Sequence, residues 1–125
     1  MARLEHVNIT VADPDATAAW LNRVFGWNLR WKGPAINGGV TAHIGSNDHY
    51  IAAYAPPDQS SEAVDTYHIR GGLNHVGVVV DDLDAIEAKA VAEGFTPKSH
   101  ADYEPGRRFY FDDHDGVEWE VVSYG

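Results

Sequence analysis

The chain of 125 residues contains no cysteine. This absence excludes disulfide bonds, thiolate nucleophiles, and zinc or iron–sulfur sites that are built on cysteine. Any metal ion that the protein holds must therefore be bound by histidine, aspartate or glutamate side chains.

Long apolar runs and an excess of positive charge are absent as well. No stretch approaches the ~18 apolar residues of a membrane-spanning helix, so we expect no membrane partner. The sequence enters a strand pattern at Leu4, which leaves no room for a secretory signal peptide and favours a cytoplasmic location. A formal net charge of −10 repels a phosphate backbone and argues against nucleic acid as a partner.

The composition that remains is that of an ordinary globular protein, with 44% hydrophobic and 11% aromatic residues. A chain of this length fits one domain, which buries roughly two-thirds of the surface that its unfolded form exposes. We therefore expect a single domain over residues 1–125.

A stretch of thirteen residues near the N-terminus recurs in the middle of the chain. LEHVNITVADPDA begins at Leu4 and LNHVGVVVDDLDA begins at Leu73, and seven of the thirteen positions are identical, including a histidine. A repeat of this kind predicts two copies of one supersecondary unit.

Each copy opens with a strand and continues into a helix. The alternation of the strand places valine and isoleucine on the core face, and places His6 and His75 on the less apolar face. Helix signals then run from an aspartate N-cap to a terminating glycine, over residues 13–26 and 82–94.

Three further strands follow each helix, so each copy has the order βαβββ. The predicted strands are residues 27–31, 40–44, 49–54, 96–100, 107–111 and 117–123. The pattern indicates an α+β fold of two modules, about 3–55 and 73–123, joined by a turn-rich linker at 56–72. A lone module would leave one face of its sheet uncovered, so two must pack together, within one chain or between chains.

Three residues of metal-ligand type occupy unusual positions in these strands. His6 and His75 are related by the repeat, and Glu120 lies deep in the last strand, where an unpartnered carboxylate is costly. If an approximate two-fold relates the halves, the two histidines converge near its axis. Two imidazoles and one carboxylate suit Fe²⁺, Mn²⁺, Ni²⁺ or Zn²⁺ with open positions for substrate oxygens. The alternative is a hydrogen-bonded His–Glu–His cluster without metal.

The sequence resembles the vicinal oxygen chelate superfamily, which includes glyoxalase I, extradiol dioxygenases, fosfomycin-resistance transferases and bleomycin-binding proteins. The resemblance covers nearly the whole chain and rests on LEHVNITVADPDATAAWLNRVFGW, LNHVGVVVDDLDA and FYFDDHDGVEWEVV. It implies a glyoxalase-like fold, in which two βαβββ modules form a curled mixed sheet around a metal-binding cleft. By this resemblance His6, His75 and Glu120 take the metal-ligand positions.

One position departs from the members of the superfamily that carry a fourth, carboxylate ligand. The repeat aligns Ala52 with Glu120, and alanine can neither bind a metal nor accept a proton. This argues against a glyoxalase or epimerase reaction, which needs a positioned base. Tyr50 and Tyr54 share the face of Ala52, so these three residues are predicted to line a substrate pocket. We interpret His43 and His49 as surface histidines.

A three-ligand site resembles those of the extradiol dioxygenases and the fosfomycin-resistance group. The dioxygenases also use a tyrosine and a histidine beside the metal, and the resemblance makes Tyr110 and His100 the candidate catalytic residues. Arg108 shares a face with Tyr110 and is the candidate for contacting an anionic part of the substrate.

The leading hypothesis is therefore a divalent-metal enzyme that acts on a small, oxygen-rich, metal-chelating substrate, as a dioxygenase or lyase. One alternative is a metal-free protein that sequesters a small molecule, as bleomycin-resistance proteins do, and another is a fosfomycin-resistance-like thiol transferase. We expect a homodimer, because one module can also pair with that of a second chain.

Overall fold

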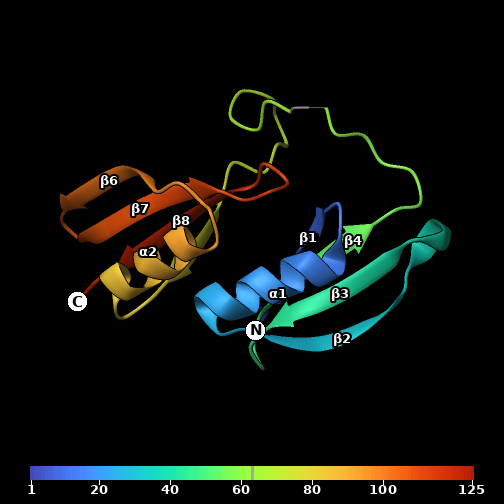
Figure 1. Cartoon of the computed structure of the whole chain (residues 1–125), viewed down its shortest axis with the longest axis horizontal. Coiled ribbons are helices and arrows are strands. Elements are labelled where there is room, and N and C mark those ends of the chain that lie inside the picture. The colour runs from blue at the N-terminus through green and yellow to red at the C-terminus, as the bar shows by residue number, and fades with distance from the viewer. Residues whose placement is uncertain (63) are drawn as a thin grey trace. The chain divides into compact units, whose positions relative to one another are not determined.

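The computed structural model describes residues 1–62 and 64–125. It divides into two compact units, Met1–Ser61 and Glu62–Gly125 (Figure 1). Within these described residues, each unit carries one α-helix and one four-stranded sheet, so each repeat copy forms a unit of its own.

The first unit follows the order βαβββ. Its elements are β1 (His6–Thr10), α1 (Pro14–Phe25), β2 (Asn28–Pro34), the short 3₁₀ turn η1 (Ile36–Gly38), β3 (Val40–Gly45) and β4 (Tyr50–Ala55). The strand order in the sheet is β1-β4-β3-β2, in which β1 runs parallel to β4 and the other pairs are antiparallel (Figure 1).

Local sequence explains both ends of α1. The Asp13 carboxylate accepts a hydrogen bond from the Asp15 N–H at 2.9 Å, and Pro14 occupies the first helical position, where no N–H is needed. The helix ends at Gly26, whose φ of 73° is a left-handed conformation that suits glycine. The buried residues of this helix, Trp20, Leu21 and Val24 among them, cover one face of the sheet.

The second unit repeats this topology. Its elements are β5 (Val76–Val79), α2 (Leu83–Ala92), β6 (Lys98–Tyr103), β7 (Gly106–Asp112) and β8 (Glu118–Ser123). The strand order is β5-β8-β7-β6, with β5 parallel to β8 (Figure 1).

The core of the second unit is aromatic. Phe109, Phe111 and Trp119 are fully buried between the sheet and α2. The turn between β7 and β8 is closed by the Asp113 carboxylate, which accepts hydrogen bonds from the Val117 N–H and from Trp119 Nε1, each at 3.0 Å. The turn therefore joins the hairpin to the core through one side chain.

These features confirm the predicted α+β class and the duplicated βαβββ pattern. Neither four-stranded sheet closes on itself within the described residues, and a cleft that binds metal stays a prediction. The single domain also stays a prediction. No helix of the described residues is long and apolar enough to cross a membrane.

Candidate metal centre

We call the side of each sheet that is turned away from its own helix the helix-free face. On the helix-free face of the second sheet, His75 Nε2 lies 3.0 Å from Glu120 Oε1. His75 directly precedes β5, and Glu120 lies on β8 opposite Gly77 of β5. The two side chains are 32% and 14% exposed, so the structure brings two of the three predicted ligands together in a half-buried place.

Both ring nitrogens of His75 face oxygen atoms. Nδ1 lies 2.6 Å from Asn74 Oδ1, while Nε2 faces the Glu120 carboxylate. A neutral imidazole has one N–H and can satisfy only one of these two oxygens. The other contact is satisfied if the Asn74 amide turns so that its NH2 group donates to Nδ1, or if a cation lies between Nε2 and Glu120.

The geometry of this pair fits a metal ion. The observed separation of 3.0 Å is that of an ordinary N–H···O hydrogen bond, and it also equals the distance between two donors that bind one ion at about 2.1 Å and at roughly 90° to each other. A metal-binding imidazole usually donates its other N–H to a nearby oxygen, and Asn74 offers that oxygen. The donor set of this unit therefore suits a divalent cation.

Two more predicted residues surround the pair. Arg108 Nη1 donates to Glu120 Oε2 at 2.9 Å, and Arg108 Nε has no hydrogen-bond partner among the described residues. The Tyr110 ring meets His75 edge-on, with ring centres 5.6 Å apart. Burial, the charge of Glu120 and a hydrogen bond with its carboxylate raise the pKa of Tyr110, so its hydroxyl keeps its proton near pH 7.

A second charged cluster on this face was not anticipated. Glu118 accepts a hydrogen bond from the Tyr67 hydroxyl, and Lys98 Nζ lies 3.1 Å from its other oxygen. Burial alone would raise the pKa of Glu118, but the contacts with Tyr67 and Lys98 hold it below the ordinary value. The alternation of β8 places Glu118 on the face of Glu120, which was the signal available in the sequence.

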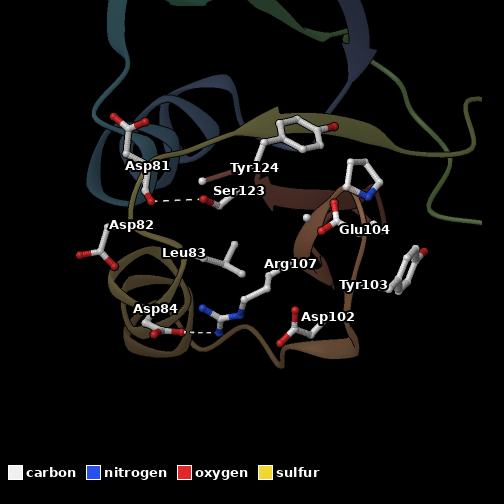
Figure 2. Close-up of a pocket in the computed structure, with 13 residues that line it drawn as sticks. Asp81, Asp82, Leu83, Asp84, Asp102, Tyr103, Glu104, Arg107, Ser123 and Tyr124 are labelled. Atoms are coloured by element: carbon white, nitrogen blue, oxygen red, sulfur yellow. Dashed lines mark hydrogen bonds and ion pairs between the residues drawn. The ribbon is translucent and has the colours of Figure 1, made fainter.

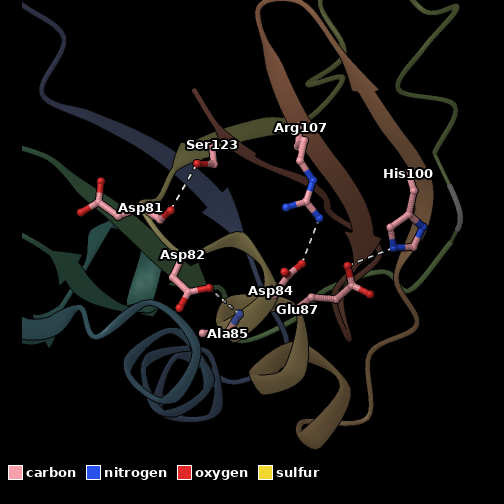
Figure 3. Close-up of polar contacts among 8 residues, drawn as sticks. All are labelled: Asp81, Asp82, Asp84, Ala85, Glu87, His100, Arg107 and Ser123. Atoms are coloured by element: carbon pink, nitrogen blue, oxygen red, sulfur yellow. Dashed lines mark hydrogen bonds and ion pairs between the residues drawn. The ribbon is translucent and has the colours of Figure 1, made fainter. Parts of the chain in front are cut away.

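The structure separates His100 from Tyr110, contrary to the predicted pairing. A bulge between Lys98 and Ala101, with a φ of 55° at Ser99, turns His100 towards the helix side of the sheet. There His100 Nε2 lies 3.0 Å from Glu87 Oε1 of α2 (Figure 3). His100 therefore joins β6 to the helix, and we assign it no role beside Tyr110.

His6 of the first unit has surroundings similar to those of His75. Its Nδ1 lies 2.8 Å from Glu5 Oε1, the side chain of the preceding residue, just as Asn74 precedes His75. This contact directs the Nδ1–H towards an oxygen and leaves Nε2 as the nitrogen for a metal.

Strand register shows which residue of the first sheet corresponds to Glu120. Ala52 lies opposite Asn8, two positions after His6, just as Glu120 lies opposite Gly77, two positions after His75. Ala52 is 2% exposed and offers no donor atom. The first sheet thus has the histidine of the second without its carboxylate.

The remaining predicted pocket residues lie on this same face. Tyr50 and Tyr54 flank Ala52 along β4, and the Tyr54 hydroxyl donates to the Ile36 carbonyl at 3.2 Å. His43, interpreted above as a surface histidine, is instead half-buried directly opposite Ala52 and stacks on Tyr50. Burial lowers the pKa of His43, so the ring is neutral near pH 7. The register of the predicted 40–54 hairpin was the signal that could have found it.

The complete triad has one member in the first unit and two in the second. Among the described residues, no three histidine, aspartate or glutamate side chains form a group that could hold a metal ion. His75 and Glu120 lie together within one unit, and the arrival of His6 at the same ion stays a prediction.

A cavity of about 720 Å³ lies elsewhere, beside the N-terminal end of α2. Figure 2 shows the carboxylates around it, and Arg107 pairs there with Asp84 at 3.0 Å. None of the predicted site residues lines this cavity. The acidic residues around this cavity distinguish it from the surroundings of Glu120, where charges of both signs meet.

A protein-family model described as Glyoxalase/Bleomycin resistance protein/Dioxygenase superfamily matches residues 3–121. No curated protein matches the chain in sequence.

Solved structures share the fold at low sequence identity. A glyoxylase/bleomycin resistance protein/dioxygenase domain from Frankia sp. EAN1pec has a TM-score of 0.84 at 21% identity, over 100% of this chain and 99% of that one. The fosfomycin resistance protein FosX from Listeria monocytogenes, complexed with Mn(II) and sulfate, has a TM-score of 0.76 at 20% identity, over 98% and 93%. TnmS3, an antibiotic binding protein from Streptomyces sp. CB03234, has a TM-score of 0.74 at 18% identity, over 100% and 98%.

Proposed function

We propose that this chain, which belongs to the glyoxalase/bleomycin resistance protein/dioxygenase superfamily, binds a divalent metal ion through His6, His75 and Glu120. It would act there on a small, oxygen-rich molecule that chelates the metal. The observation that carries the proposal is the His75–Glu120 pair, 3.0 Å apart, with the imidazole oriented by Asn74.

A bound divalent ion would polarise the substrate oxygens as a Lewis acid. Tyr110 keeps its proton at neutral pH and hydrogen-bonds the Glu120 carboxylate, and Arg108 donates to the same carboxylate through Nη1 at 2.9 Å. Both residues would therefore hold the predicted carboxylate ligand in place.

Ala52 limits the reactions that the proposed site could catalyse. A reaction that removes a proton beside a carbonyl needs a base, and the register position that would supply a carboxylate from the first sheet holds a methyl group. We therefore favour oxygenation, lyase chemistry or group transfer, in which the three-ligand set is sufficient.

Calorimetric titration with Mn²⁺, Ni²⁺, Zn²⁺ and, without oxygen, Fe²⁺ tests the proposal. We expect about one ion per chain for at least one metal, and a loss of affinity of more than about 100-fold in His75→Ala. The matched control is His68→Ala, which removes an exposed histidine of the same unit. A wild-type protein that binds none of the four ions, or a His75→Ala variant that binds as tightly, would refute the metal site.

The second candidate is a metal-free protein that sequesters a small molecule. It is favoured by the Arg108–Glu120–His75 arrangement, because the arginine and the imidazole both contact the carboxylate at hydrogen-bond distance without a metal. Under this alternative, ligand binding survives treatment with a chelator. Under the metal-dependent proposal, the same treatment abolishes the function. The likeness to TnmS3, an antibiotic binding protein, supports this candidate.

A further inference from the structure

The backbone at the two predicted histidine ligands is held in different ways. His6 is the first residue of β1 and pairs with Tyr50 of β4. In the second unit, the pairing of β5 with β8 begins one residue after the histidine, at Val76 and Trp119. The sheet therefore fixes the backbone of His6 directly, whereas the orientation of His75 depends more on the segment that precedes it.

The first unit also holds its histidine through a tyrosine. Tyr50 stacks on the His6 ring, with ring centres 4.7 Å apart, and its hydroxyl donates at 3.2 Å to the carboxylate that faces Nδ1 of that ring. Tyr50 lies two residues before Ala52 on β4. Glu118 lies two residues before Glu120 on β8, so it is the corresponding residue of the second sheet. A carboxylate at this position offers no ring to the second histidine.

A tyrosine from the predicted linker reaches Glu118 instead. The Tyr67 hydroxyl donates to the Glu118 carboxylate, and Lys98 Nζ lies 3.1 Å from the other oxygen. Glu118 directly precedes the β8 partner of Val76, so this contact lies level with His75. Tyr67 is itself 57% exposed, so its hydroxyl attaches it to the sheet more than burial of its ring does.

The segment that carries Tyr67 is a closed loop over residues 65–72. The Asp65 carboxylate accepts hydrogen bonds from the backbone N–H groups of Tyr67 and of the residue after it, each at 3.0 Å. At the other end, a Cβ atom on Gly72 would lie only 3.0 Å from Thr66 Cα, so glycine lets the two ends of the loop approach closely. The loop is therefore compact, and it ends three residues before the second histidine.

We propose that Tyr67 is a positioning residue for His75. Its hydroxyl holds the 65–72 loop against β8, and the loop holds Asn74, whose side chain lies 2.6 Å from His75 Nδ1. The imidazole is thereby kept directed at Glu120, which is 3.0 Å from Nε2. The second unit thus takes from the linker the tyrosine hydroxyl that the first unit supplies from β4.

This inference rests on the proposed function in one respect, because the imidazole that Tyr67 positions is a predicted metal ligand. The orientation of the imidazole can be measured in metal-free protein. The two proposals can therefore fail separately.

The first test is a ¹H–¹⁵N correlation spectrum of the histidine rings in metal-free protein. Tyr67→Phe removes the hydroxyl and keeps the ring, so the His75 signals should shift and broaden as the imidazole leaves its single orientation. The signals of His100, which contacts α2 on the other side of the same sheet, should stay unchanged. The matched control is Tyr124→Phe, which alters a similarly exposed tyrosine of the same unit and should change neither set of signals.

A second variant perturbs the loop and keeps the Tyr67 hydroxyl. In Gly72→Ala the new Cβ atom would lie 2.9 Å from the Thr66 carbonyl oxygen, so the loop must shift. The same His75 signals should change. Gly125→Ala is the control, because a Cβ atom there meets nothing within 4 Å.

The other test is calorimetric titration with Mn²⁺. Tyr67→Phe should weaken binding by about tenfold, at the lower end of the effect of residues that orient a metal ligand. In a Glu118→Ala background, the same substitution should have no further effect on the affinity or on the His75 signals, because the acceptor of the hydroxyl is already absent. Circular dichroism confirms that each variant is folded.

Three results would overturn the positioning role. They are unchanged His75 signals in Tyr67→Phe, His75 and His100 signals that change together as general destabilisation would cause, and an effect of Tyr67→Phe that is equally large in Glu118→Ala. A wild-type protein that binds no metal ion but shows the selective change at His75 would remove only the metal site. Metal binding by the wild type with His75 signals and affinity unchanged in Tyr67→Phe would remove only the positioning role.

Discussion

The two sheets have the same topology and register but carry opposite chemistry on their helix-free faces. Ala52 corresponds to Glu120, and His43, opposite Ala52, corresponds to Tyr110, opposite Glu120. Trp31 on β2 likewise corresponds to Lys98 on β6. The first face is therefore a row of rings, whereas the second is a network of charges.

The histidines are the exception to this divergence. His6 and His75 occupy equivalent positions, and each places Nδ1 beside an oxygen of the residue that precedes it. The duplicated backbone thus fixes where side chains lie, and substitution at the other positions gives the two faces different side chains. On our proposal, the second face supplies two metal ligands and the first supplies one.

The largest expected effect concerns whether the two units unfold together. Phe109→Ala empties a fully buried site of the second unit and should cost about 3–5 kcal/mol. If the units form one domain, far-UV circular dichroism and tryptophan fluorescence should show the same lowered midpoint. Fluorescence reports mainly on the first unit, which contains Trp20, Trp27 and Trp31.

The control for this change is Val91→Ala on the exposed side of α2, which should shift stability by less than about 0.5 kcal/mol. Two separate transitions in Phe109→Ala, with the first unit unaffected, would show that the units are independent domains.

The next largest effect tests whether the two histidines are equivalent. Glu5→Ala and Asn74→Ala each remove the oxygen that faces Nδ1 of a predicted ligand, so each should weaken Mn²⁺ binding by about 10–100-fold. Asn47→Ala, in an exposed turn of the first unit, is the control. An effect in Asn74→Ala without one in Glu5→Ala would show that only the second unit binds the metal.

A smaller effect is expected from a change on the helix-free face of the second sheet. The pKa of Glu118 is depressed in the folded protein, so its contacts with Tyr67 and Lys98 stabilise the fold when the pH is above the ordinary pKa of 4.5. This stabilisation is lost as the pH falls through the pKa that Glu118 has in the folded state. Glu118→Gln should therefore lower the free energy of unfolding by about 1.5 kcal/mol near pH 7. The gap should narrow as the pH is lowered below 4.5. A gap that is independent of pH in denaturant titrations would contradict this assignment.

The smallest effect tests what the two units share. Asp13→Ala and Asp82→Ala each remove a helix N-cap, so each should cost about 1 kcal/mol in thermal or urea unfolding. Figure 3 shows the Asp82 carboxylate at the Ala85 N–H. Clearly unequal costs would mean that the repeat copies do not use their caps in the same way.

The elements of the fold were predictable because local signals determine them. Asp13 and Asp82 cap their helices, Gly26 ends α1, and the acidic turn before Gly116 joins β7 to β8. Strand alternation also placed Glu120 on the correct face, beside His75.

Other features depend on interactions that the pattern does not contain. The bulge at Ser99 turns His100 to the other face of its sheet, and nothing in the alternation of residues 96–100 indicates this bulge. Tyr67 reaches Glu118 from a segment predicted only as a linker. The position of His43 could be predicted only from the register of the hairpin, which places it opposite Ala52. The predicted meeting of His6 with His75 would depend on how the two units pack, and residue patterns within each unit do not determine that packing.

The most direct test of the central claim is to count the imidazoles on the metal. X-ray absorption of the Mn²⁺-loaded protein should show outer-shell scattering from two histidine rings, falling to one in His6→Ala. A spectrum with one ring that does not change in His6→Ala, or with oxygen ligands alone, would contradict a site shared by the two halves.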